Sequence, residues 1–297
     1  MEGSPTIIIS PPLSRAQDTT MVRVVTDSAA DIPPEVARDL GITVVPLYVR
    51  FGAEVYRDGV DISPDEFYRR LASDRVLPVS STFSPGEMAE IYDALAQEAD
   101  GILSVHVSAR LTSVCEVALQ AKQQIRKECR VEVIDSQSGA MGEGLPAIVA
   151  ARVAQEGADL GQVAQVAREA IPRSHVRICF DTLEYLRRGG RIGRVRALMG
   201  SVLKTNPILG LREGEPYPFG RERGRAKAIE RVCQFVDGLP GISELAVEHA
   251  STPDEAEALA QRLDSKFPRE RMFITRLSPV VGVHVGPRAI GVCVLAN

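Results

Sequence analysis

The chain has 297 residues, a formal charge of -4 and 44% hydrophobic residues. This composition suffices for two α/β domains with separate cores, and it excludes a chain that is disordered throughout. The acidic balance argues against a general nucleic-acid-binding protein, because such proteins carry an excess of Lys and Arg. Five scattered cysteines without a CxxC pair favour reduced thiols, and no apolar run approaches the ~20 residues of a membrane helix. We therefore expect a cytoplasmic protein without stable membrane insertion.

The first part of the chain predicts an extension followed by a strand and a helix. Residues 1–20 are rich in Pro, Ser and Thr, and we expect them to be a poorly ordered extension. A β-branched run at 22–26 predicts a strand, and the polar loop 27–31 leads to a helix start at Pro33. An apolar run at 42–49 and a hairpin at 50–58 follow. Ser63 and Ser84 have the sequence of helix N-caps, with Glu87 at capping-box spacing from Ser84.

Residues 77–85, LPVSSTFSP, place four hydroxyl side chains between two prolines and include no acid, base or histidine. The prolines limit the freedom of the loop. Ser80, Ser81 and Thr82 can each donate and accept hydrogen bonds. The stretch lies just before a helix start, where free backbone N–H groups favour an anion. It therefore predicts a binding loop instead of a catalytic one.

From residue 101 strands and helices alternate, with strands at 102–107 and 131–134 and helices at 111–127, 145–155 and 160–170. This order implies a mostly parallel sheet flanked by helices. Ligands of such sheets bind at the carboxyl ends of the strands, which here carry the loop 27–31, Ser108 with Thr112 and Ser113, and the loop 135–138. Hydroxyls from the Ser80 and Thr112 regions could jointly bind a carboxylate, although capping is an equally common role for such clusters.

A second α/β domain with a mixed sheet is expected from residue 175, so that the two domains span 21–174 and 175–297. Strands are predicted at 177–180, 208–211, 217–219, 244–248, 272–276 and 289–295. Helices are predicted before Gly189 and near 195–203, 226–235 and 253–266.

An arginine-rich segment begins this domain. Residues 186–194, LRRGGRIGR, carry four arginines around three glycines, a set that can bind phosphate or carboxylate through planar guanidinium groups. Residues 186–227 contain 11 basic and 3 acidic residues, which predicts a docking face. Nucleic acid is the less favoured target because no aromatic residues are interleaved for base stacking.

Among the four histidines, His284 is the most plausible functional one, because residues 282–287 form a segment bounded by Gly and Pro that we expect to be a loop. His106, His175 and His249 are expected to pack or to be solvated. Residues 135–144 superficially suggest a nucleotide loop. However, the glycine spacing does not match GxGxxG and no P-loop Lys follows, so close backbone packing is the better explanation.

No catalytic or metal-binding set is apparent in the sequence. It contains no HExxH, no nucleophile elbow and no Cys/His cluster with metal-ligand spacing. Asp27 and Asp31 could converge on a metal or a phosphate, although a turn and helix cap is the commoner role of such a loop. The alternative to a binding protein is therefore a single-chain hydrolase or phosphotransferase that uses Asp27, Asp31 and the arginine-rich loop.

Seven motifs in order resemble the DegV family: TDSAAD, PVSSTFSP, SARLTS, VIDSQSGAMGEG, LEYLRRGGRIG, NPIL and HVGP. They extend from about Val22 to the C-terminus. Characterised members of that family are fatty-acid-binding subunits of the bacterial fatty acid kinase. The resemblance implies a non-enzymatic carrier without a cofactor, which buries a long-chain fatty acid in a tunnel between or beside the two domains. It also implies that the carboxylate is presented to a separate kinase subunit.

The resemblance also implies the ligand-binding residues. The hydroxyl positions that hold the carboxylate in the family fall on Ser80 and Thr112, and Ser81 and Ser113 lie beside them. The histidine of the C-terminal loop falls on His284.

The basic positions of the family fall on Arg191, in the GGRI motif, and on Arg223. Arg191 is expected both to bind the ligand and, together with Arg194 and Arg223, to dock the kinase.

Several positions depart from the family pattern. Val79, Thr82 and Phe83 replace Thr, Gln and Pro in the first loop, and Ser113 and Val114 replace Gly and Thr in the second. Val285 and Arg288 replace Thr and Gly in the last loop. An additional arginine beside His284 could shift the head-group preference toward another anion.

Overall fold

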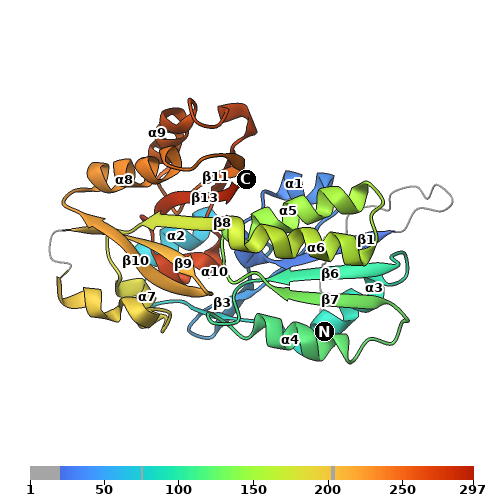
Figure 1. Ribbon diagram of the computed structural model, residues 1–297. Helices are drawn as coiled ribbons and strands as arrows, with labels where there is room; N and C mark the ends of the chain where they lie inside the picture. The colour runs from blue at the N-terminus through green and yellow to red at the C-terminus, as the bar shows by residue number, and fades with distance from the viewer. Residues whose placement is uncertain (1–20, 75, 202–204) are drawn as a thin grey trace.

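The computed structural model describes residues 21–74, 76–201 and 205–297, so the extension expected at 1–20 lies outside the described residues. The chain forms two α/β domains that lie side by side, each around its own sheet, and a small third sheet (Figure 1). The first sheet is parallel and flanked by helices, and the second is mixed. The fold class predicted from the sequence is confirmed.

The N-terminal sheet has the strand order β2-β1-β6-β7, and all its neighbouring strands are parallel. Its strands are β1 (Val22–Asp27), β2 (Thr43–Val45), β6 (Gly101–His106) and β7 (Arg130–Asp135). Every residue of β1 and β6 is buried, as expected of parallel strands that are covered on both faces. In Figure 1, α5 and α6 lie on one side of this sheet, and α3 and α4 lie on the other. The helices of this part are α1 (Pro34–Asp39), α2 (Pro64–Ser73), α3 (Pro85–Leu95), α4 (Val114–Lys122), α5 (Met141–Gln155) and α6 (Leu160–Ala170).

The small antiparallel sheet has the order β4-β3-β5 and consists of β3 (Tyr48–Phe51), β4 (Glu54–Arg57) and β5 (Val79–Ser81). Part of the hydroxyl-rich stretch is therefore a strand, in which Ser80 pairs with Val49 of β3. The predicted capping box is present, because Glu87 N donates to Ser84 Oγ at 3.2 Å and Ser84 N donates to the Glu87 carboxylate at 2.6 Å. The strand and the cap fix the direction of the hydroxyl side chains between them.

The C-terminal sheet has the order β10-β9-β8-β13-β11-β12, and only the pair β11 and β12 is parallel among its described strands. Its strands are β8 (Ser174–Cys179), β9 (Asn206–Arg212), β10 (Glu215–Glu222), β11 (Ile242–His249), β12 (Phe273–Arg276) and β13 (Ile290–Ala296). Its helices are α7 (Glu184–Arg188), α8 (Arg225–Asp237), α9 (Pro253–Leu263) and α10 (Pro279–Val285). Short 3-10 segments are η1 (Ser28–Ala30), η2 (Ile171–Arg173), η3 (Gly193–Ser201) and η4 (Arg269–Arg271). The helices α8 and α9 cover the outer face of this sheet (Figure 1).

Helix α5 joins the two domains, because it packs on β1 of the first sheet and on β8 and β13 of the second. It begins at Met141, four residues earlier than predicted, so Gly142 and Gly144 lie inside it. A Cβ at Gly142 would be 2.3 Å from Val176 Cγ2, and one at Gly144 would be 2.5 Å from the carbonyl of Ala30. The expected role of these glycines in close backbone packing is confirmed.

Three other predicted elements differ from the structure. In place of the helix expected near 195–203 there is the 3-10 segment η3, and residues 202–203 of that prediction lie outside the described residues. The helix expected at 111–127 spans only Val114–Lys122, because Thr112 N bonds to Ser108 O and the preceding residues form a turn. The loop expected around His284 is wrong, since this residue lies in helix α10. Gly282 does not break that helix. It lets α10 approach α2, where a Cβ would be 2.5 Å from Phe67 Cε1. None of the helices in the described part of the chain is long and apolar enough to cross a membrane.

Candidate functional site

A cavity of about 360 Å³ lies between the N-terminal domain, the small sheet and the inner face of the C-terminal sheet. Most of its wall is apolar and comes from loops and strands of both domains, including Leu47, Val107, Val176, Ile178, Phe180 and Leu209. The alternation of β8 explains part of this wall, since Val176 and Ile178 point to one face of the sheet. The cavity can therefore enclose an elongated apolar group.

The polar part of the wall contains every residue that the sequence predicted for ligand binding. These residues are Ser80, Ser81, Thr112, Ser113, Arg191 and His284. They come from β5, the turn before α4, the segment after α7 and helix α10, so the fold brings four distant segments to one cavity. Their contact with a ligand stays a prediction.

A hydrogen bond joins two of these residues, since Ser80 Oγ lies 2.8 Å from His284 Nε2. Burial, and secondarily the charge of Arg191, lowers the pKa of His284 to about 4. The imidazole is therefore neutral near pH 7. Its Nδ1 has no hydrogen-bond partner in the described part of the chain. Sequence reasoning missed this serine–histidine pair, because the two residues are 204 positions apart.

The GGRI motif, residues 189–192, packs against the imidazole of His284. A Cβ at Gly189 would lie 2.3 Å from His284 Nδ1, so only glycine leaves room for the imidazole. Arg191 Nε donates to Leu111 O at 3.0 Å, and its Nη1 donates to Gly189 O at 2.6 Å. Arg191 thus ties the motif to the turn that carries Thr112, in addition to lining the cavity.

Thr82 is a cavity residue that the predicted ligand set lacked. Thr82 lines the cavity, and its hydroxyl is buried without a hydrogen-bond partner among the described residues. The signal was present in the sequence, because Thr82 belongs to the same run of hydroxyl side chains as Ser80 and Ser81. A buried hydroxyl without a partner is costly, and a polar ligand atom would satisfy it.

The predicted docking arginines lie outside the cavity wall, apart from Arg191. Arg194 is exposed, and its Nε is 2.8 Å from a carboxylate oxygen of Glu215. Arg223 is also exposed. A surface ion pair such as that of Arg194 is weak, so both side chains remain accessible to a partner.

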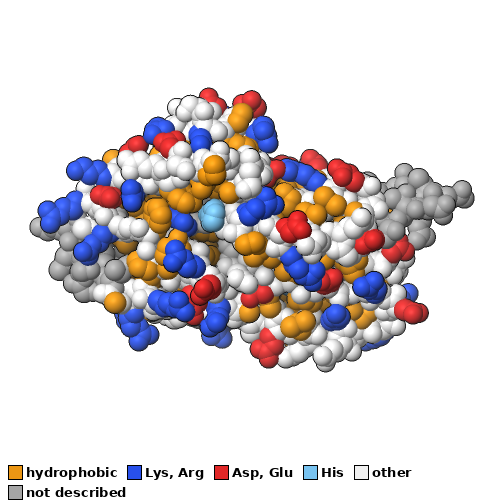
Figure 2. All heavy atoms as spheres, in the orientation of Figure 1, with side chains coloured by type: hydrophobic (Ala, Val, Ile, Leu, Met, Phe, Trp, Pro, Cys, Tyr) orange, Lys and Arg blue, Asp and Glu red, His pale blue; other side chains and the backbone are white. Residues whose placement is uncertain are grey.

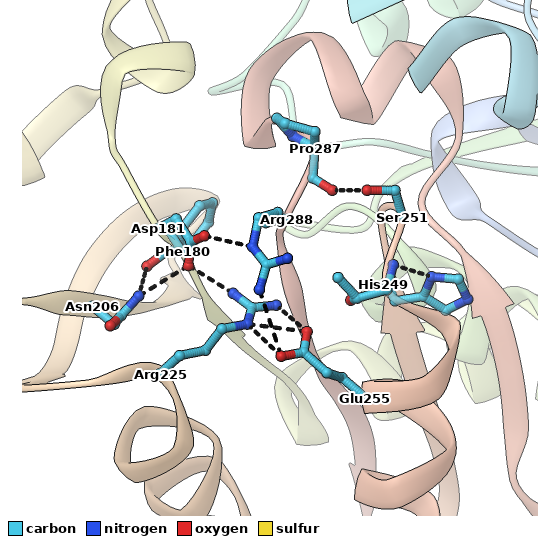
Figure 3. Close-up of polar contacts among 10 residues, drawn as sticks. Phe180, Asp181, Asn206, Arg225, His249, Ser251, Glu255, Pro287 and Arg288 are labelled. Atoms are coloured by element: carbon cyan, nitrogen blue, oxygen red, sulfur yellow. Dashed lines mark hydrogen bonds and ion pairs between the residues drawn. The ribbon is translucent and has the colours of Figure 1, made fainter. Parts of the chain in front are cut away.

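Arg288 belongs to an ionic network instead of the cavity (Figure 3). Its Nε donates to Asp181 Oδ2 at 2.7 Å, and its Nη2 lies 3.6 Å from Glu255 Oε1. Arg225 bonds to the same two carboxylates, at 2.8 Å to Asp181 Oδ1 and 2.7 Å to Glu255 Oε2. With its charge held by these partners, Arg288 gives no basis for the shift in head-group preference that the sequence suggested.

Asp27 and Asp31, the acids of the alternative hypothesis, are buried and do not line the cavity. Asp27 caps η1 and accepts hydrogen bonds from Ala29 N at 3.0 Å and His106 Nδ1 at 2.9 Å. Asp31 accepts from Ser278 N at 2.9 Å, at the start of α10. Their structural roles are turn formation and capping, and the expectation that His106 packs in the interior is confirmed.

Asp27, His106 and Glu143 form the group closest to a metal site in the described part of the chain, with ligand atoms within 4.8 Å of one another. All three side chains are fully buried. His106 is held on both ring nitrogens, by Asp27 at 2.9 Å and by Ser104 Oγ at 2.7 Å. Burial and the charge of Asp27 raise the pKa of Glu143 well above its usual range, which favours a protonated carboxyl group. The arrangement is that of an internal hydrogen-bond network.

Comparisons with known proteins agree with this architecture. A family model described as the DegV family of uncharacterised proteins matches residues 21–297. A DegV domain-containing protein of Deinococcus radiodurans is 35% identical over 277 residues, covering 91% of this chain and 97% of that protein. A solved structure described as fatty acid binding of a DegV family protein from Thermus thermophilus has a TM-score of 0.85 and 33% identity, with 94% of this chain and 100% of that chain covered. DegV from Bacillus subtilis, described as a fatty acid binding protein, has a TM-score of 0.86 and 29% identity, with the same coverage.

Proposed function

Because the chain belongs to the DegV family, we propose that it binds a long-chain fatty acid in the cavity and presents the carboxylate to a separate fatty acid kinase. The acyl chain lies along the apolar wall, and the carboxylate lies at the cluster of Ser80, Thr112 and His284. The protein itself acts as a carrier and carries out no reaction.

The observation that supports this proposal most directly is the composition of the cavity wall. Apolar side chains form most of it, and hydroxyls, one imidazole and one guanidinium form the rest. Burying about 14 methylene groups at ~0.8 kcal/mol each gives roughly 11 kcal/mol of gross transfer free energy. The carboxylate then needs only a few hydrogen bonds to avoid an uncompensated charge. Two relatives with similar folds are described as binding fatty acids.

The pair of Ser80 and His284 fits a carrier better than a hydrolase. A serine nucleophile needs a base of suitable pKa, and that base is normally oriented by a third group. Here the pKa of His284 is lowered to about 4, and its Nδ1 has no partner among the described residues. The imidazole is consequently a weak base near pH 7, and it can serve as a neutral hydrogen-bonding group for the ligand carboxylate.

The proposed kinase-docking surface is the exposed part of the arginine-rich region around Arg194 and Arg223. These side chains follow the GGRI motif in sequence, and that motif contacts His284. A basic surface next to the head-group end suits a partner that delivers a phosphoryl group, since electrostatic complementarity accelerates and orients association.

The proposal is tested by purifying the chain natively, extracting its lipid and identifying it by mass spectrometry. We expect a long-chain fatty acid at about one molecule per chain, or saturable uptake of added oleate after delipidation. Absence of both would overturn the proposal. Turnover of ester or phosphoester substrates by the purified chain that disappears in Asp27→Asn would favour the hydrolase or phosphotransferase instead.

A further inference from the structure

A second cavity, of about 550 Å³, lies on the other side of β8 and β9 from the first. It is formed by the loop after β7, the start of β8 and the hairpin of β9 and β10. The alternation of β8 places Val176 and Ile178 on the first cavity and His175 and Arg177 on the second, and Leu211 lies at the border between the two. In contrast to the first cavity, the wall of the second is rich in polar groups.

Arg177 is the central feature of this second cavity. Its side chain is buried, with 7% exposure, and it lies against the rings of Phe235 at 4.1 Å and Phe219 at 4.4 Å. The guanidinium Nη1 donates to Val176 O at 2.7 Å, whereas Nε has no partner. No carboxylate pairs with it in the described part of the chain. A buried cation without a counter-charge is unfavourable. An anionic ligand bound in the cavity would supply the counter-charge that Arg177 lacks.

A second guanidinium group lies at the same cavity. Arg212 is exposed and stacks on the ring of Tyr217 at 4.4 Å, and the face of that ring is also 5.4 Å from the Arg177 guanidinium. Arg212 likewise forms no ion pair with a described residue. In Figure 2, basic side chains lie over β9 and β10 on the face of the molecule that is shown.

Hydroxyl groups complete the polar wall. Ser136 and Ser138 line it from the loop after β7, and Ser136 Oγ accepts from Ser138 N at 3.2 Å, which leaves its hydrogen available to a ligand oxygen. The carboxylate of Asp135 is turned toward the backbone, where it accepts from Gln137 N at 2.8 Å. The other nearby charges are Glu213, exposed in the hairpin turn, and Arg168, which pairs with Glu132.

We propose that this second cavity binds a phosphate group, either as free phosphate or as a small phosphate monoester. Two guanidinium groups without carboxylate partners suit a dianion, because each can donate charge-assisted hydrogen bonds to different phosphate oxygens. The serine hydroxyls can donate to the remaining oxygens. None of these residues belongs to the proposed fatty acid head-group site, so phosphate binding here is independent of fatty acid binding.

The test is calorimetric titration of the full chain with inorganic phosphate and, separately, with glycerol phosphate, at constant ionic strength in a phosphate-free buffer. We expect saturable binding at one site and a loss of about tenfold in affinity in Arg212→Ala, because one charge-assisted hydrogen bond is removed. Ser136→Ala should weaken binding less. Tighter binding of the ester than of phosphate would identify a monoester as the ligand, and the reverse would identify free phosphate.

Arg130→Ala is the matched control, because Arg130 is an exposed arginine at the opposite end of β7 and does not line the cavity. It should bind phosphate like the wild type. Absence of saturable binding by either probe would overturn the proposal. Equal losses in Arg130→Ala and Arg212→Ala would also overturn it, since they would indicate general attraction to surface charge. Arg212 is exposed, so Arg212→Ala is expected to fold like the wild type and its loss of affinity can be read directly.

Discussion

Ser80 Oγ and His284 Nε2 lie 2.8 Å apart, and this contact joins β5 of the small sheet to helix α10 of the C-terminal domain. The two residues close the polar part of the first cavity from opposite domains. Neither has a carboxylate beside it among the residues that line the cavity. The contact therefore builds a neutral hydrogen-bonding site, which a ligand carboxylate can enter without competing with a protein anion.

Replacing the two hydroxyls tests this site. We expect Ser80→Ala combined with Thr112→Ala to weaken fatty acid binding by about tenfold to a hundredfold, because a carboxylate loses two hydrogen-bond donors. Binding of oleate to delipidated protein measures the effect. Arg194→Ala should leave affinity within threefold, since Arg194 is exposed and lies outside the cavity wall. An unchanged affinity in the double variant would place the carboxylate elsewhere.

Arg191→Ala separates ligand binding from partner docking. We expect it to reduce phosphorylation of bound fatty acid by the kinase more than it reduces fatty acid affinity. The Arg191 guanidinium is already bonded to two backbone carbonyls, which limits its use by the ligand. Affinity and kinase-coupled turnover are measured on the same preparation. Equal losses in both would show that the arginine acts mainly on the ligand.

The sequence predicted the fold and most of the polar cavity wall, because these depend on local patterns. The β-branched runs and capping boxes are read from neighbouring residues, and the hydroxyl clusters follow strands whose carboxyl ends share one sheet edge. Helix α10 was missed because PVVGVHV is short and is bounded by Pro and Gly, as a loop would be. Its Gly282 reflects the close approach of Phe67, which no local pattern reveals.

Contacts between distant segments could not be predicted. The partners of Arg288 are Asp181, which follows β8, and Glu255, which lies in the first turn of α9. The second cavity was missed for the same reason, because Arg177 appears in the sequence as one polar residue in a strand. Its aromatic neighbours Phe219 and Phe235 lie on β10 and α8.

Gly189→Ala tests the packing of the GGRI motif behind His284. The added Cβ would lie 2.3 Å from His284 Nδ1, so the imidazole must move. We expect about tenfold weaker fatty acid binding and a loss of roughly 1–3 kcal/mol in the free energy of unfolding. Gly86→Ala is the control, since its Cβ would meet only Ser84 Oγ at 4.0 Å. Similar effects of both substitutions on binding would contradict the role of Gly189.

The pH dependence of binding should depend on His284. Burial lowers the pKa of this imidazole to about 4 in the free protein, and a carboxylate placed beside it raises the pKa again. While the imidazole stays neutral in both states, affinity should change little from pH 8 to 7. Below the pKa of the bound imidazole, binding takes up a proton and affinity increases as the pH falls, and His284→Gln should remove this increase. Calorimetry in buffers of different ionisation enthalpy measures the proton uptake. Equal pH slopes in the variant and the wild type would exclude His284 as the group responsible.

The pH dependence of stability should depend on Asp58, a carboxyl group that is 3% exposed and accepts a hydrogen bond from Ser28 Oγ at 2.8 Å. Burial raises its pKa to about 7 from an ordinary 3.8. Between these values the native state holds a proton that the unfolded state has lost. The free energy of unfolding therefore falls as the pH rises, by about 1.4 kcal/mol per pH unit for this group.

Asp58→Asn removes that titration, so the variant should lose less stability between pH 5 and 7 than the wild type and should be the more stable protein at pH 8. Part of the slope should remain, because burial also raises the pKa of Glu248 to about 7. Urea unfolding at several pH values measures the slopes. Asp61→Asn is the control, since its pairing with Arg57 lowers the pKa of Asp61 and its removal leaves the Asp58 slope in place. A slope in Asp58→Asn as steep as in the wild type would mean that Asp58 is ionised in the native protein throughout this range.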